Sequence, residues 1–398
     1  MKRNSLRKPA PSPFRKHWPL DRRVVFLNHG SFGACPLEVL RHQAALRLKM
    51  ESEPVAFLHR HYVRMVDEAR LPLAAFLGED PENLAFVTNA TAAVNAVVSS
   101  WKLRRGDEIL TTCFDYNACR NVLVEHARRA GAGVVVADVP FPIRSQRQVV
   151  DSVLAAVTPR TRFAMLDHVT SNTAVVLPIK RLVGLLETRG VSVLVDGAHA
   201  PGMLDLSPSR IGASWYVGNL HKWVCAPKGA AFIHVRQDRR RDIHPAVISH
   251  GNNTPRGDHP AWQDRFDWAG TFDPTAWFSV PKAIGVVGDM MPDGWSDVRT
   301  RNRAMILEAR RMLCAALDVK APCPESMIGS MATLPLPARF QGVAHADRIA
   351  PEQTRLFEEF GIEVPLVKVG GLRCFRVSGH LHNSADDYRY LAAALGRL

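Results

Sequence analysis

Short apolar runs alternate with helix-length segments between residues 84 and 235, and this alternation constrains the fold more than any other feature of the chain. Apolar runs of this length predict strands, and the segments of about 10 to 15 residues between them predict helices. Strands that alternate with helices in this way are typical of βαβ units, which build a mainly parallel sheet. We therefore predict an α/β fold whose strands are LAFV, DEILTT, VVVADV, RFAMLDHV, VSVLVD, SWYVGN and GAAFIHV.

The pattern changes near residue 290, where one long helical segment precedes several short strands. The helix is predicted from Trp295 to Asp318, the strands at MATLPLP, IEVPLV and LRCFRVSG, and a last helix from Ser384. We interpret this region as a smaller α+β domain. The predicted divisions are a basic N-terminal arm at 1–24, a large domain at 25–285 whose first segment contributes to the small domain, and a small C-terminal domain at 286–398.

The 398 residues carry a net charge of +13, which raises the question of an acidic partner. The basic residues fall in short clusters with few aromatic side chains, and no recognition helix or RNA-binding motif accompanies them. A non-enzymatic protein that binds nucleic acid through this charge is therefore an alternative that the pattern disfavours.

Two features of the composition bear on location. No apolar run approaches the roughly 20 residues that cross a bilayer, so no membrane association is expected. The seven cysteines form no CxxC pair, and an odd number without a signal peptide favours reduced thiols. We therefore predict a cytoplasmic protein.

Polar residues follow the predicted strands at their carboxyl ends, where parallel sheets bind ligands. TNAT begins a helix whose free N–H groups would suit a phosphate, although Asn89 or Thr91 would also serve as an ordinary helix cap. Asp196 ends the apolar strand VLVD, where a charge is costly unless it is paired, and His199 follows three residues later. The alternative for Asp196 is a carboxylate that accepts hydrogen bonds from the backbone of a turn.

Two cationic residues lie in unusually apolar surroundings. Lys222 enters the tract WVCAPKGAAF, and a lysine that loses water also loses basicity and becomes a nucleophile. Arg376 lies within the apolar strand LRCFRVSG, where it would suit bidentate capture of a carboxylate. The alternatives are a lysine that reaches solvent and an arginine in a structural ion pair.

A phosphate site, a carboxylate, a desolvated lysine and an arginine together match pyridoxal 5′-phosphate, which we predict as the cofactor. Asp196 would keep the pyridine nitrogen protonated, Lys222 would condense with the aldehyde, and Arg376 would hold the carboxylate of an amino-acid-like substrate. No metal site is predicted.

The chain resembles the class V aminotransferase family of fold-type I pyridoxal phosphate enzymes, and within it the isopenicillin N epimerase-like branch. The resemblance runs from residue 26 to 383 and rests on FLNHGSFGACP, FVTNATAAVNAV, DYNACRN, DHVTSNTAVVLPI, VDGAHAPG, GNLHKWVCAPKGAAF, WAGTFDPTAWFSVP and LRCFRVSGHLHN. It implies a large domain with a mainly parallel sheet of the seven-stranded type and a smaller α+β C-terminal domain.

The resemblance also implies residue roles. Lys222 would be the Schiff-base lysine and Asp196 the partner of the pyridinium. Many relatives have Ser at the position of Asn219, which weakens that assignment. Thr271 would reach the phosphate of a neighbouring subunit, which implies a homodimer with a shared active site. The remaining cofactor-binding residues would be Ala90, Thr91, Tyr116 (ring stacking), Asn172 and His199 (phenolic oxygen), and His221, and the substrate-binding residues Arg376, Asn28 and Ser31.

The reaction predicted from this branch is epimerisation or racemisation at the α carbon. A C–S β-lyase and an aminotransferase are the alternatives, because both also begin with proton removal at that carbon. Epimerisation needs a proton donor on the opposite face, for which Tyr116 or a water would serve. Cysteine desulfuration is disfavoured because residues 342–361 contain no cysteine, and we expect Cys374, inside a strand, to be packed in the core.

Overall fold

A seven-stranded sheet forms the centre of the large domain, in the order β2-β8-β7-β6-β5-β3-β4. The computed structural model describes residues 6–257, 259–342 and 349–398. The neighbours from β7 to β4 are parallel, whereas β8 is antiparallel to both β7 and β2. All seven predicted strands are present, as β2 (Leu84–Val87), β3 (Glu108–Thr112), β4 (Gly133–Ala137), β5 (Thr161–Asp167), β6 (Ser192–Asp196), β7 (Trp215–Asn219) and β8 (Ala231–Val235).

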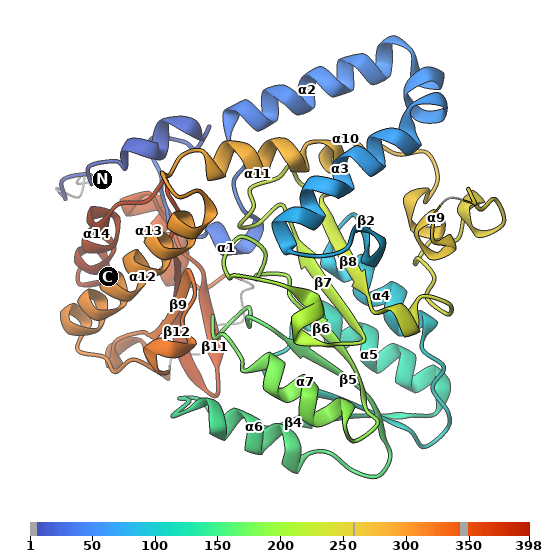
Figure 1. Cartoon of the computed structure of the whole chain (residues 1–398). Coiled ribbons are helices and arrows are strands. Elements are labelled where there is room, and N and C mark those ends of the chain that lie inside the picture. The colour runs from blue at the N-terminus through green and yellow to red at the C-terminus, as the bar shows by residue number, and fades with distance from the viewer. Residues whose placement is uncertain (1–5, 258, 343–348) are drawn as a thin grey trace.

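Helices cover both faces of this sheet, with α4 and α5 on one face and α6 and α7 on the other (Figure 1). Because both faces are buried, successive residues of one strand belong to different layers of the core. Leu194 of β6 packs with α4, whereas its neighbours Val193 and Val195 pack in the layer of α7. These helices are α4 (Ala90–Ser100), α5 (Asn117–Ala130), α6 (Gln146–Ala155) and α7 (Ile179–Glu187).

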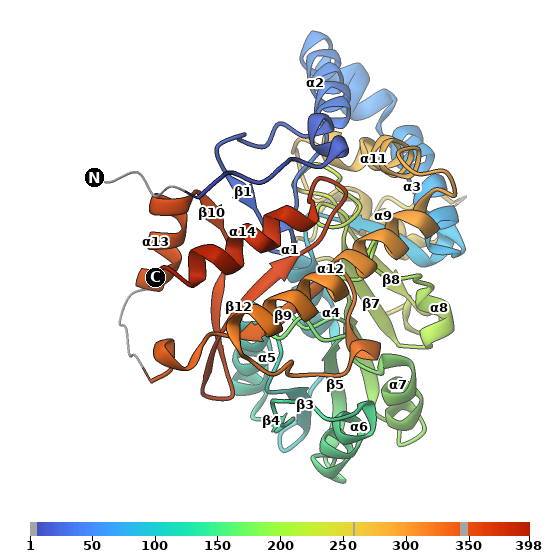
Figure 2. The ribbon, with the colours of Figure 1, turned by 90° about the vertical axis from the view of Figure 1, so that its left-hand side faces the viewer.

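The C-terminal region contains a three-stranded antiparallel sheet in the order β11-β12-β9. Figure 2 shows α12 and α14 in front of these strands. The predicted strand IEVPLV is divided in two, because Pro365 has no N–H to continue a ladder. The elements are α12 (Trp295–Leu317), β9 (Met331–Pro335), α13 (Pro351–Phe360), β10 (Ile362–Glu363), β11 (Leu366–Val369), β12 (Leu372–Ser378) and α14 (Ala385–Leu395).

The N-terminal part of the chain connects the two regions. Strand β1 (Val25–Phe26) pairs with β10, and α1 (His29–Phe32) follows it between the two sheets (Figure 1). Of the predicted basic arm, residues 1–5 lie outside the described residues. The rest lies against the C-terminal region, where the Ser12 hydroxyl donates to the Leu381 carbonyl over 2.6 Å. Two further helices, α2 (Leu37–Ser52) and α3 (Tyr62–Leu77), precede the central sheet.

The segment 236–280 is too long for a plain connector. It contains the short helices α9 (Ala261–Asp267) and α10 (Thr275–Phe278). Helix α11 (Val280–Gly288) then leads into the C-terminal region. Buried ion pairs hold this segment, including Arg70 to Asp267 at 2.6 Å. In the described ranges, no helix is long and apolar enough to span a bilayer.

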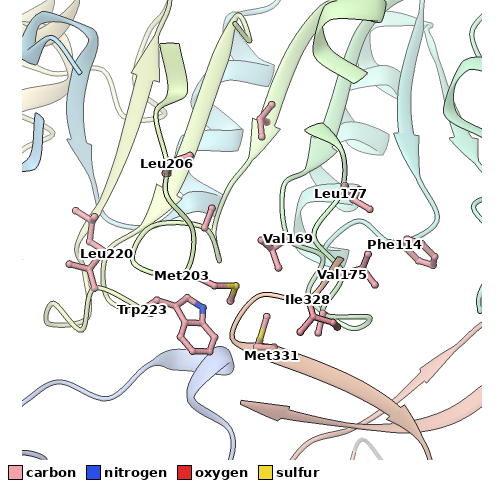
Figure 3. Packing of buried hydrophobic residues seen from close by; sticks show 14 of the residues in the cluster. Phe114, Val169, Val175, Leu177, Met203, Leu206, Leu220, Trp223, Ile328 and Met331 are labelled. Atoms are coloured by element: carbon pink, nitrogen blue, oxygen red, sulfur yellow. The ribbon is translucent and has the colours of Figure 1, made fainter. Parts of the chain in front are cut away.

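An apolar layer lies between the ends of the central strands and the C-terminal sheet. In Figure 3, Met203 and Trp223 from loops of the large domain lie close to Met331 of β9. Gly30 of α1 packs against the same methionine so closely that a Cβ there would lie 2.3 Å from its sulfur. This packing places α1 directly beside the loop that carries Lys222.

Candidate active site

A cavity of about 370 Å³ opens at the carboxyl ends of β5, β6 and β7. Nine predicted site residues line it, namely Ser31, Ala90, Thr91, Tyr116, Asp196, His199, Asn219, His221 and Lys222. A larger cavity of about 770 Å³ adjoins α3 and α7 but contains none of the predicted residues. The strand ends therefore bring together most of the constellation that the sequence predicts.

The Lys222 amine lies inside this cavity, with its Nζ 3.1 Å from His199 Nε2. The Trp223 indole can only donate, and it lies 3.4 Å from His199 Nδ1, so that nitrogen accepts and the neutral ring carries its proton on Nε2. Nε2 can therefore donate to the lone pair of Lys222 once the amine has lost its proton. Burial and the neighbouring Arg376 lower the pKa of Lys222 to about 8, so the neutral amine is far more accessible near neutral pH than that of an ordinary lysine.

The lowered pKa of Lys222 predicts the pH dependence of its reaction with an aldehyde. A lysine attacks only in its neutral form, which increases as pH rises through the pKa. The rate of cofactor loading by cofactor-free protein should therefore rise between about pH 7 and 9 and then level off. Stopped-flow absorbance after mixing with pyridoxal phosphate would measure this rate, and a rise that continues to the ordinary lysine range near pH 10.4 would contradict the assignment.

Buried histidines lie beside the main chain of Lys222 and hold its carbonyl in place by a hydrogen bond. His29 Nε2 donates to the Lys222 carbonyl over 2.9 Å, and His29 Nδ1 lies 3.1 Å from His382 Nε2. His29, Cys225 and His380 also place possible metal-ligand atoms within 4.8 Å of one another. Because His29 Nε2 already donates to a carbonyl, and Cys225 Sγ lies 3.4 Å from His380 Nε2, we interpret this group as support for the lysine loop.

Asp196 ends β6 at the buried side of the cavity and is 3% exposed. Its Oδ1 accepts from the Ala198 N–H over 2.9 Å, and its Oδ2 from the Cys119 thiol over 3.3 Å. Burial raises the pKa of Asp196, and these two hydrogen bonds and Lys222 oppose the shift. A buried carboxyl in this position suits a protonated ring nitrogen, which would supply the missing positive charge.

The N-terminus of α4 lies at another part of the cavity wall. Asn89 caps the helix by accepting from the Ala92 N–H over 2.8 Å, and Asn219 Oδ1 accepts from the Ala90 N–H over 2.9 Å. Thr91, at the second helical position, has an N–H without an intrahelical acceptor. Asn219 therefore bridges β7 to the helix, and Thr91 leaves a donor for an anion.

Arg376 of β12 is 3% exposed and reaches α1 and the loop after β5. It donates to the Ser171 carbonyl over 2.7 Å, to the Ser31 hydroxyl over 2.8 Å, and to Asn28 Oδ1 over 3.3 Å. Its Nε is buried without a hydrogen-bond partner, and burial lowers its pKa to about 10. Within the described part of the chain no carboxylate forms an ion pair with it, which leaves its charge available to a ligand.

Four predicted residues do not line the cavity, namely Arg376 and Asn28, which are hydrogen-bonded to each other, and Asn172 and Thr271. Asn172 is exposed, and its carbonyl accepts from Thr333 over 2.7 Å, while its neighbour Ser171 lines the cavity instead. Thr271 is also exposed on this chain and is not among the residues that line the cavity. Tyr116 lines the cavity and is 48% exposed.

The structure adds Asp167 and Lys228 to the cavity wall, which the sequence analysis missed. Asp167 ends an apolar strand as Asp196 does, and that shared pattern is the signal that would have found it. Lys228 donates to the Gly33 carbonyl over 3.0 Å, and nothing in its local sequence marked it. Cys374 is fully buried, as expected, and burial raises the pKa of its thiol to about 12, which leaves it unreactive.

These residues fit pyridoxal phosphate by their chemistry. The cavity offers a buried carboxyl for a pyridinium, an amine of lowered pKa for an aldehyde and free helix donors for a phosphate. The orphaned Nε of Arg376 remains for a substrate carboxylate. Such a site on a mainly parallel sheet defines a pyridoxal phosphate enzyme of fold type I.

Comparison with known proteins identifies the family. The family model for class V aminotransferases matches residues 35–305, more than half of the chain. The protein therefore belongs to the class V aminotransferase family and is a pyridoxal phosphate-dependent enzyme. The predictions of family, fold class and cofactor are confirmed.

Relatives within this family carry two kinds of name. The chain is 33% identical to isopenicillin N epimerase of Streptomyces clavuligerus over 391 residues, which cover 95% of this chain and 96% of that protein. It is 32% identical to putative L-cysteine desulfhydrase 2 of Oryza sativa subsp. japonica over 417 residues, which cover 95% of this chain and 85% of that protein.

Solved structures share the fold at lower identity. The cystine C–S lyase C-DES matches with a TM-score of 0.77 at 20% identity, covering 94% of this chain and 97% of that chain. The cysteine desulfurase CsdA of Escherichia coli matches with a TM-score of 0.78 at 20% identity, covering 99% of this chain and 98% of that chain. At this level of identity the likeness concerns the fold.

Proposed function

We propose that this enzyme epimerises an amino-acid substrate at its α carbon. The observation that carries the proposal is that Lys222, whose pKa is lowered to about 8, and Tyr116 line one cavity. Arg376 adds to it, because its hydrogen bonds run to Ser31 and Ser171 in the wall of that cavity. The identity of about one third to isopenicillin N epimerases over nearly the whole chain supports the same reaction.

Each residue has a distinct task in this proposal. Pyridoxal phosphate, when bound, supplies an aldehyde for the amine and a ring that withdraws electrons from the bonds of the α carbon. Lys222 removes the α proton from one face, and Arg376 fixes the orientation of the α carbon by binding the carboxylate. Asp196 holds the proton on the ring nitrogen. Tyr116 returns a proton to the opposite face, which inverts the configuration.

The phosphate contacts and the subunit arrangement belong to the same proposal. Thr91, Ala90, Asn219 and His221 would bind the phosphate, and His199 and Asn172 would lie toward the phenolic oxygen. The position of Thr271, exposed and away from this chain's own cavity, supports a homodimer in which it serves the neighbouring site. Seven free cysteines support the reducing cytoplasm as the location.

A C–S β-lyase is the second candidate. It is supported by the identity of 32% to a putative L-cysteine desulfhydrase over 95% of the chain. Lys222 and Arg376 would act in the same way, but a sulfur leaving group would depart from the β carbon in place of reprotonation. This reaction requires no thiol of the enzyme, which agrees with the buried, unreactive Cys374.

Proton NMR of the loaded enzyme in D₂O with a panel of amino acids, including S-substituted cysteines, separates these reactions. We expect deuterium at the α carbon with loss of chirality. Tyr116→Phe should preserve exchange of one enantiomer and slow racemisation at least about tenfold, because one proton donor contributes about 10²–10⁴ to rate. Pyruvate and ammonia from the thioethers would establish the lyase instead, and a keto acid that requires an amino acceptor would establish an aminotransferase.

A further inference from the structure

Two buried carboxyl groups lie side by side at the inner end of the cavity. Asp167 is the last residue of β5 and Asp196 the last of β6, and the two are Cα partners in the parallel ladder. Partners in register present their side chains to the same face of the sheet. Both residues are 3% exposed, and both line the cavity.

The two carboxyls differ in how their oxygens are bonded. Both oxygens of Asp196 accept hydrogen bonds, from the Ala198 N–H and from the Cys119 thiol. Asp167 Oδ2, in contrast, is buried and has no hydrogen-bond partner among the residues that the structure describes. An ionised carboxylate without partners is costly in such a place, and two adjacent anions would add repulsion to that cost.

The charged groups around Asp167 do not remove this cost. Burial raises the pKa of Asp167 most, and Asp196 and Asp115 raise it further, whereas Lys222 and Arg120 oppose the shift. Arg120 is already paired with Asp115 at 2.5 Å. Lys222 opposes the shift as a neighbouring cation, but burial remains the largest cause and the net direction is upward.

We propose that Asp167 is the proton-holding member of an Asp167–Asp196 acid pair, which stays neutral so that Asp196 alone presents negative charge to the cofactor. One anion matches the single positive charge of a pyridinium, whereas two would leave a net negative charge in a buried site. Asp167 is thus a positioning residue that sets the charge of Asp196's surroundings. This inference rests on the proposed site, but not on which reaction the enzyme catalyses.

The proton that folded Asp167 holds makes the stability of the protein depend on pH. A carboxyl whose pKa is raised on folding binds a proton in the folded state that the unfolded chain has released. Stability is then lost as pH rises above the ordinary aspartate value of about 3.9 and toward the raised pKa. Asp167→Asn keeps the shape of the side chain but cannot ionise, so the stability of this variant should not fall with rising pH for this reason.

The first test is thermal unfolding of cofactor-free wild type and Asp167→Asn as a function of pH. At pH 7 the variant should unfold about 1–3 °C higher, and the difference should close as pH falls to about 4. If Asp167 were an ionised, stabilising group, the variant would be less stable at pH 7, and that result would overturn the proposal. Asp115→Asn, which loses an ion pair with Arg120, is the control and should be destabilised.

The second test reads the proton directly and does not depend on variant stability. Infrared spectra of wild type labelled with ¹³C-aspartate should contain the carbonyl band of a protonated carboxylic acid at pH 7, and Asp167→Asn should lack it. Absence of the band would refute the proposal, even for an enzyme shown to be a lyase.

Discussion

Lys222→Ala should abolish turnover, with a loss of at least about 10³-fold, because the variant removes both the amine that meets the aldehyde and the base at the α carbon. The lowered pKa of Lys222, about 8, and its place in the cavity beside His199 at 3.1 Å are the physical basis of this expectation. Treatment with borohydride should fix the cofactor to the Lys222 peptide in wild type only, which mass spectrometry would detect.

Two further variants test why turnover is lost when Lys222 is replaced. Lys222→Arg keeps a positive charge but cannot lose its proton, so it should be equally inactive if the neutral amine is required. Lys180→Ala, which changes an exposed side chain of α7, should leave turnover unchanged. Full activity of Lys222→Ala with the cofactor bound would remove Lys222 from the mechanism.

Asp196→Asn should retain bound cofactor but slow exchange of the α proton by about 10²–10³-fold, or about 3–4 kcal/mol of transition-state stabilisation. The reason is that the amide cannot hold a proton on the ring nitrogen, so the ring withdraws electrons less strongly when negative charge develops at the α carbon. Deuterium exchange followed by NMR measures this step without regard to the later fate of the substrate.

The control for the exchange rate of Asp196→Asn is a carboxyl outside the cavity. Asp205→Asn should exchange at the wild-type rate, because this side chain is 91% exposed and lies outside the cavity of the proposed site. An unchanged exchange rate in Asp196→Asn would show that Asp196 does not act on the ring nitrogen.

The local pattern of the chain was sufficient for the strands of the central sheet. The strands β2 to β8 were predicted because each is a short apolar run bounded by polar or turn residues, a signal that lies within a few neighbouring positions. The prediction of one strand at IEVPLV was wrong, because Pro365 interrupts the ladder and divides the run into β10 and β11.

The same local signals identified Lys222, Asp196 and Arg376, since a charge inside an apolar run is costly unless the site uses it. Which groups these side chains meet depends on contacts between distant segments. Arg376 bonds to Ser31 and to Ser171 only because α1 and the loop after β5 are both packed beside β12.

The chain by itself thus determined the strand order along the sequence, the family, and the charged residues at the strand ends. Tertiary structure decided which of them share a cavity: it left Asn172 exposed and brought Asp167 beside Asp196. The physical reason is that strand register and burial set the distances and the solvation of charged groups, and both arise from packing between segments remote in the sequence.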